Sequence, residues 1–189
     1  MEASLDAAPT PGEDSELMRR VQAGDEAALG ELMRRWERPV KAVIGRLVLN
    51  AREAEDLAQE TFVRVWQQRD RFRADAAFRP WVFAIAVNLA RNRLRWWRSR
   101  PEVGLDAWTD GAADGATGAT SAEGAERARA VRDAIAALPT DLREAIVLAE
   151  YEQLSHAEIA EAVGATPKAV ENRVARARAK LRTALARWL

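Results

Sequence analysis

The stretch LSHAEIAEAVGATPKAVENRVARARAKLR, residues 154–182, decides the fold of the C-terminal part of the chain. Ser155 and Glu158 have the spacing of a capping box, which predicts the start of a short helix, and Gly164 predicts its end. Thr166 followed by Pro167 predicts the N-cap and first residue of a second helix. Two helices joined by a tight glycine turn form a helix-turn-helix.

The second of these helices has two distinct faces. One face is apolar and is expected to pack inward: Val170, Val174, Ala177, Leu181 and Trp188. Lys168, Asn172 and Arg176 lie on the opposite face and begin at the helix N-terminus, the part that enters the DNA major groove in such motifs. The alternative is an ordinary amphipathic helix with solvated charges. The two caps, the glycine turn and the absence of acids after residue 171 favour DNA binding.

Charge is sorted along the chain, although the formal net charge is zero. Residues 78–100 contain six arginines and no acid, and residues 172–189 contain five arginines, one lysine and no acid. Between them, residues 101–126 contain six acids and no base. This order is typical of a nucleic-acid binder with two basic parts and an acidic connector.

The coarse organisation is all-α, with two small helical domains joined by an acidic flexible linker. Alanine, leucine, arginine and glutamate dominate, and no window alternates as a strand would. We expect a disordered N-terminus over residues 1–13, a first domain over 14–100, the linker over 101–125 and a second domain over 126–189. The chain has no cysteine, no signal-peptide pattern and no apolar run long enough to span a bilayer, so we expect a cytoplasmic protein.

The helix predicted over residues 52–68 also has two faces. The first is expected to be buried and comprises Leu57, Ala58, Thr61, Phe62 and Val65. The second carries acids and amides and comprises Asp56, Gln59, Glu60, Val63 and Gln67. Taken alone, this second face is most simply a solvated surface.

The helix predicted over residues 79–99 is more informative. Its apolar face comprises Phe83, Val87, Ala90, Leu94 and Trp97. The opposite face is expected to point outward and comprises Trp81, Ile85, Asn88, Asn92 and Arg95. Single-stranded nucleic acid suits such a face, because bases stack on aromatic rings while arginines hold the backbone. The alternative is that Trp81 belongs to the core.

Three segments, in this order, resemble the extracytoplasmic-function sigma factors of bacterial RNA polymerase. EDLAQETFVRVW (55–66) is similar to the helix of sigma region 2 that docks on the polymerase clamp, and FRPWVFAIAVNLARNRLR (78–95) to the adjoining helix that melts and reads the minus-10 element. ALPTDLREAIVLAEYEQLSHAEIAEAVGATPKAVENRVARARAKLR (137–182) is similar to region 4. The chain has no space for regions 1 and 3, which indicates this group within the family.

The resemblance implies partners and site residues. Asp56, Gln59 and Glu60 would contact the β′ clamp of core RNA polymerase, with Phe62 as structural support. The minus-10 strand would be bound by Trp81, Asn88, Arg91, Asn92 and Arg95, and the loop over 68–77 would capture a flipped base. The minus-35 element would be read by Thr166, Lys168, Glu171, Asn172, Arg173 and Arg176.

The resemblance also implies contact of the protein with the polymerase β flap, passage of the acidic linker through the polymerase channels, and regulation by an anti-sigma factor. An aspartate is usual in the family where this chain has Asn92, so no particular minus-10 sequence is carried over.

The expected function is promoter-directed transcription initiation with core RNA polymerase and promoter DNA as partners. The main alternative is a helix-turn-helix regulator that binds duplex DNA without polymerase. An enzyme is disfavoured because the chain has one histidine, no cysteine and no phosphate-binding or metal-spaced motif. A basic amphipathic membrane binder is disfavoured by the glutamates of the N-terminal helices. We therefore expect no catalytic residue, metal, cofactor, small-molecule substrate or membrane insertion.

Overall fold

The computed structural model describes residues 11–73, 75–99 and 122–188, and every regular element in these ranges is helical. The elements are α1 (Pro11–Gln22), α2 (Glu26–Val48), α3 (Ala51–Gln67), the short 3-10 helix η1 (Arg69–Arg71), α4 (Phe78–Arg98), α5 (Ala122–Ala136), α6 (Thr140–Glu150), α7 (His156–Val163), α8 (Pro167–Ala184) and the short 3-10 helix η3 (Ala186–Trp188). The all-α prediction is confirmed.

Polar side chains and glycines set several helix ends, and for α7 and α8 they do so at the predicted places. The side chain of Asp25 accepts a hydrogen bond from the Ala28 N–H at 3.1 Å and caps α2. Ser155 and Glu158 form the predicted capping box of α7. Gly164 ends α7 with φ of 66°, a left-handed conformation that favours glycine. Thr166 caps α8 by accepting from the Ala169 N–H.

The first unit comprises α1 to α4, and its core is centred on Trp36 of α2. The Trp36 ring makes edge contacts with Phe78 and Phe83 of α4, each at 5.9 Å between ring centroids. Its indole Nε1 donates to the carboxylate of Asp14 on α1 at 3.0 Å. Burial raises the pKa of Asp14, although the hydrogen bond from Trp36 and the charge of Arg35 act in the opposite direction. This buried contact fixes α1 against α2.

The second unit comprises α5 to α8 and contains the predicted helix-turn-helix as α7 and α8. Val170, Val174 and Ala177 of α8 are fully buried, as the inward face predicts, whereas Leu181 and Trp188 are half-buried. Helices α6 and α7 both pack against α8. Helix α8 is therefore held by apolar contacts on one side only.

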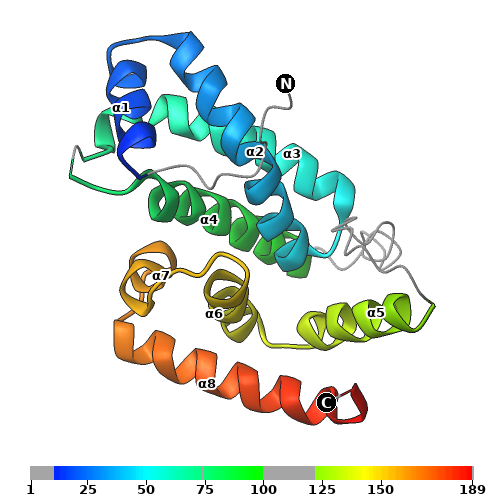
Figure 1. Ribbon diagram of the computed structural model, residues 1–189. Helices are drawn as coiled ribbons and strands as arrows, with labels where there is room; N and C mark the ends of the chain where they lie inside the picture. The colour runs from blue at the N-terminus through cyan, green and yellow to red at the C-terminus, as the bar shows by residue number, and fades with distance from the viewer. Residues whose placement is uncertain (1–10, 74, 100–121, 189) are drawn as a thin grey trace, which may run out of the picture.

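The two units pack against each other. Helix α4 lies on α7, and α2 contacts α6 and α5, so one continuous apolar core runs through both units. Figure 1 shows α4 along the boundary, with α6 and α7 beneath it and α8 on the far side of them. The sequence did not predict this packing, because it links residues far apart in the chain.

Two predicted boundaries need correction. Helix α1 begins at Pro11, so residues 11–13 belong to a helix and not to a disordered N-terminus. Helix α5 begins at Ala122, so the last four residues of the predicted linker, 122–125, are helical as well. Residues 1–10 and the linker positions 101–121 lie outside the described residues.

Candidate nucleic-acid interface

Helix α3 presents a polar row on its outer side. Asp56 and Gln59 are exposed, and Glu60 is half-buried with its carboxylate 3.1 Å from the Arg64 guanidinium. Val63 lies beside this row and is 52% exposed, which is unusual for a large apolar side chain. Phe62 is buried on the opposite side of the helix. The outer side of α3 therefore presents acidic, amide and valine side chains on a helix that is packed on the core through its other side, and a partner protein could cover this surface.

Helix α4 carries amide and guanidinium groups in pairs. The Arg95 Nη2 donates to the Asn92 Oδ1 at 2.8 Å, and the Arg91 Nη1 donates to the Asn88 Oδ1 at 3.5 Å. Asn88, Asn92 and Arg95 are exposed. Such pairs offer amide edges for bases and positive charge for phosphates along one line of the helix.

The outward face predicted for α4 is wrong at Ile85 and only partly right at Trp81. Ile85 is 9% exposed and belongs to the core. Trp81 is half-buried, with its ring centroid 5.2 Å from that of Phe72 and 6.1 Å from that of Phe78. Both residues were assigned from helical spacing within α4 alone, which cannot include contacts from Phe72 in the preceding loop and from the second unit.

The described part of the loop after α3 is fixed to α1. The Gln22 Nε2 donates to the Arg69 carbonyl at 3.0 Å and to the Phe72 carbonyl at 2.9 Å. The Ser15 hydroxyl donates to the Ala76 carbonyl at 3.4 Å. Phe72 is buried against α4. Side chains of α1 therefore hold the backbone of a segment that the sequence associates with DNA.

Arg91 is not free, although the sequence places it among the DNA contacts. Its Nη2 and Nε donate to the two carboxylate oxygens of Glu144 on α6, at 2.6 and 3.0 Å. Glu144 is 3% exposed. The hydrogen bonds from Arg91 to Glu144 raise the pKa of Arg91, against an opposing effect of burial.

Helix α8 exposes the predicted recognition residues. Lys168, Asn172 and Arg176 are exposed along one side. The Lys168 ammonium lies 2.9 Å from the Glu171 carboxylate, and its hydrogen bonds lower the pKa of Glu171. Arg173 is half-buried, and its Nε lies 3.7 Å from the Asp141 carboxylate. The exposed side of α8 therefore carries cationic and amide groups of the kind that contact bases and phosphates in a DNA groove.

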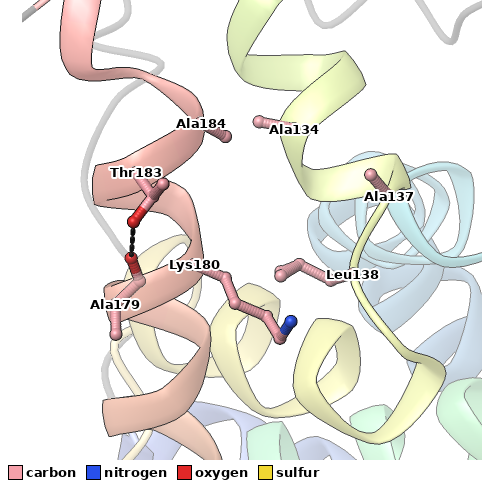
Figure 2. A pocket seen from close by; sticks show the side chains of 7 residues that line it. All are labelled: Ala134, Ala137, Leu138, Ala179, Lys180, Thr183 and Ala184. Carbon is pink, nitrogen blue, oxygen red and sulfur yellow. Dashed lines mark hydrogen bonds between the residues drawn. The ribbon is translucent and has the colours of Figure 1, made fainter.

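An open hollow lies between α5 and α8 (Figure 2). Small and apolar side chains line most of it, with one lysine at the edge: Ala134, Ala137, Leu138, Ala179, Lys180, Thr183 and Ala184. It is separate from the exposed row Lys168, Asn172 and Arg176.

The described ranges contain neither a cluster of metal-ligand side chains nor a membrane-spanning helix. Within residues 11–73, 75–99 and 122–188, no three acidic or histidine side chains come together as metal ligands do. None of the helices in these same ranges is both long enough and apolar enough to cross a bilayer.

Comparison with known proteins shows the family. The family model described as Sigma-70 region 2 matches residues 32–100, and the one described as Sigma-70, region 4 matches residues 128–181. The RNA polymerase sigma-H factor of Pseudomonas aeruginosa is 34% identical over 93% of this chain and 95% of its own length. The ECF RNA polymerase sigma-E factor of Haemophilus influenzae is 33% identical over 87% of this chain and 91% of its own.

The chain belongs to the extracytoplasmic-function sigma factors.

A solved structure supports the same family. A structure of CnrH in complex with the cytosolic domain of CnrY matches this sigma factor with a TM-score of 0.70 and 30% identity, over 92% of this chain and 97% of that one. The complex of the sigma factor RpoE with the anti-sigma factor NepR from Bartonella quintana matches with a TM-score of 0.68 at 24% identity, over 83% and 96% of the two chains, and shares the fold.

Family, fold class and function are thus as the sequence predicted. This sigma factor is a transcription initiation factor that directs RNA polymerase to promoters, and the relatives give no support to a regulator that acts without polymerase. Sequence reasoning missed Gln22 and Glu144. Both act through contacts between distant segments, and no local pattern marks them.

Proposed function

We propose that three exposed surfaces of this sigma factor each make a different contact during promoter recognition. The α3 row binds polymerase, the α4 pairs bind the minus-10 strand, and the exposed side of α8 binds the minus-35 duplex. The observation that carries the proposal is that each helix buries its apolar side and leaves polar side chains outside, where the family resemblance expects contacts. Region 2 then comprises α1 to α4, and region 4 comprises α5 to α8.

The polymerase contact rests on α3. Asp56, Gln59 and Glu60 supply acceptors for basic or amide groups of the β′ clamp, and Val63 supplies apolar area at the same surface. Phe62 acts from the core by holding α3 against the rest of region 2. A second contact, with the β flap, would fall on region 4, where the hollow between α5 and α8 offers an apolar recess (Figure 2).

The minus-10 contact rests on α4 and the neighbouring loop. Asn88, Asn92, Arg91 and Arg95 would hold an unpaired strand, with Trp81 offering the exposed part of its ring to a base. Stacking contributes about 1 to 3 kcal/mol per base, which matches the few kcal/mol needed to extrude a base from a duplex. The protein thereby stabilises an opened duplex and carries out no bond-making step itself.

The minus-35 contact rests on the first half of α8. Lys168, Asn172 and Arg176 would enter the major groove, with Thr166, Glu171 and Arg173 at its edges. When polymerase fixes both regions, two individually weak DNA contacts act as one stronger contact. Relatives of this fold are solved with anti-sigma factors, and we infer that such a protein also regulates this chain.

Run-off transcription with core polymerase on a fragmented genomic library, with mapping of the start sites, tests the proposal. Mapped promoters should share an upstream and a downstream element. The double variant Asp56→Ala/Glu60→Ala should lose polymerase binding and transcripts together. Its matched control is Glu55→Ala, an exposed acid on the same helix that pairs with Lys41 at 2.9 Å and lies outside the row.

The recognition helix has its own test. Lys168→Ala and Asn172→Ala should lower the preference for the upstream element without lowering polymerase affinity, whereas Arg182→Ala near the end of α8 should preserve that preference. Unchanged upstream preference in both variants would show that α8 does not read the minus-35 element. Duplex binding without any transcript would favour a plain regulator.

A further inference from the structure

Arginines provide most of the polar contacts between region 2 and region 4. Beyond the Arg91 contact with Glu144, the Arg79 guanidinium donates to the Glu152 carbonyl and lies 3.8 Å from its carboxylate. Arg143 Nη1 donates to the Leu47 carbonyl at 2.9 Å. The boundary between the regions therefore combines the shared apolar core with arginine contacts that cross it.

The strongest of these contacts uses an arginine of the proposed minus-10 surface. Glu144 binds Arg91 with both carboxylate oxygens and is almost completely buried. A carboxylate that accepts two parallel guanidinium bonds has the same geometry and charge sign as a phosphate bound by arginine. Arg91 Nη1 also lies 3.5 Å from the Val163 carbonyl at the end of α7. A DNA strand cannot take the Arg91 guanidinium while α6 and α7 remain there.

The α8 surface remains uncovered in this arrangement. Lys168, Asn172 and Arg176 are exposed, and α8 lies on the side of region 4 away from α4 (Figure 1). The packing of the two regions thus covers part of the proposed minus-10 surface on α4 and leaves the proposed minus-35 surface on α8 exposed.

We propose that Glu144 is an internal phosphate mimic that latches region 4 onto region 2 and keeps Arg91 from nucleic-acid strands until the regions separate. The part that concerns DNA rests on the proposed function, because it takes Arg91 as a strand contact. Duplex binding by α8 is independent of the latch. Polymerase, by holding the two regions apart, releases Arg91 for the strand.

The size of the effect follows from population arithmetic. The apparent dissociation constant for a strand equals the intrinsic constant divided by the fraction of open molecules. Breaking a buried ion pair by neutralising one partner leaves the other charge uncompensated and favours opening. We expect the open fraction to rise about tenfold in Glu144→Gln, which corresponds to about 1.4 kcal/mol.

Energy transfer between two dyes measures the opening directly. The chain has no cysteine, so Glu37→Cys on α2 and Arg182→Cys on α8, both exposed, accept the two dyes selectively. The labelled full chain should show high transfer, and Glu144→Gln should lower it. Glu150→Gln is the matched control, because Glu150 is on the same helix but pairs within region 4, with Arg178 at 2.8 Å. Circular dichroism checks that each variant is folded.

A 12-nucleotide single strand of deoxythymidine, labelled with fluorescein, serves as the strand probe. Glu144→Gln should bind it about tenfold more tightly than the parent chain, and Glu150→Gln should bind it equally. The swapped pair Arg91→Glu/Glu144→Arg should recover high energy transfer without tighter strand binding. Equal energy transfer in the parent chain and Glu144→Gln would overturn the latch. Lower transfer with unchanged strand affinity would leave closure by Glu144 standing and refute Arg91 as a strand contact.

Discussion

Replacing Arg143 with methionine tests how a single buried cation joins the two regions. Arg143 is buried and donates to three carbonyls, those of Leu47 at 2.9 Å, Leu138 at 3.1 Å and Ala136. Leu47 lies in the last turn of α2, Ala136 is the last residue of α5, and Leu138 lies between α5 and α6. One guanidinium therefore holds the end of a region 2 helix and a turn of region 4 together.

The expected loss is about 2 kcal/mol in the free energy of unfolding. Hydrogen bonds from a charged donor contribute about 1.5 to 3 kcal/mol each, so three bonds give at least about 4.5 kcal/mol. Two terms oppose this sum. Burial lowers the pKa of Arg143, because desolvation disfavours its charged form. The buried Nε of Arg143 has no hydrogen-bond partner, which costs about 1 to 3 kcal/mol of stability. Methionine fills similar space and removes both opposing terms.

Urea unfolding followed by circular dichroism measures the change. A loss of about 2 kcal/mol corresponds to a decrease in Tm of about 4 to 8 °C for a protein of this size. Arg143→Lys should lose nearly as much, because an ammonium cannot reach three carbonyls in the arginine geometry. Arg132→Met, at an exposed position of α5, is the control and should stay within about 0.5 kcal/mol of the parent chain. A methionine variant as stable as the parent, or more stable, would refute the reasoning and show that desolvation outweighs the three bonds.

Three further predictions concern single side chains. Gly164→Ala should destabilise region 4 by about 1 to 2 kcal/mol through its positive φ alone, since the added Cβ meets no atom within 4 Å, and minus-35 duplex affinity measured well below the Tm should not change. Arg176→Ala should reduce the slope of log affinity against log salt by about 1 in duplex titrations, whereas an unchanged slope would exclude a phosphate contact. Asp14→Asn should alter the pH dependence of stability. Burial raises the Asp14 pKa above 3.8, so the folded chain keeps a proton on Asp14 at pH values where the unfolded chain has lost it. The stability of the parent chain relative to the variant should therefore fall as the pH rises above 3.8. Urea midpoints measured at several pH values would show the opposite trend if the pKa of Asp14 were lowered by folding.

Sequence reasoning succeeded where a contact is local. The caps Ser155 and Thr166, the glycine that ends α7 and the buried side of α8 all depend on residues within one or two turns, and the structure confirms them. Helical spacing likewise placed Phe62 in the core.

It failed where a contact joins distant segments. Ile85 lies on the polar side of α4 by spacing but is buried, and Trp81 packs on Phe72 from the preceding loop. The partner of Arg91 is 53 residues away in the chain. No periodicity within α4 contains that information, because it depends on how the two units pack against each other.

Gln22 and Ser15 of α1 anchor the carbonyls of Arg69, Phe72 and Ala76, in the loop that we propose to capture a base. These hydrogen bonds form when the protein folds, so conformational entropy at the anchored residues is already lost before any nucleotide binds. Under the proposed function, a base bound here meets a receptor that is already ordered, so its stacking energy contributes to affinity and not to ordering the receptor. Helix α1 carries no proposed DNA contact itself, but by ordering this loop it would lower the entropy cost of strand capture.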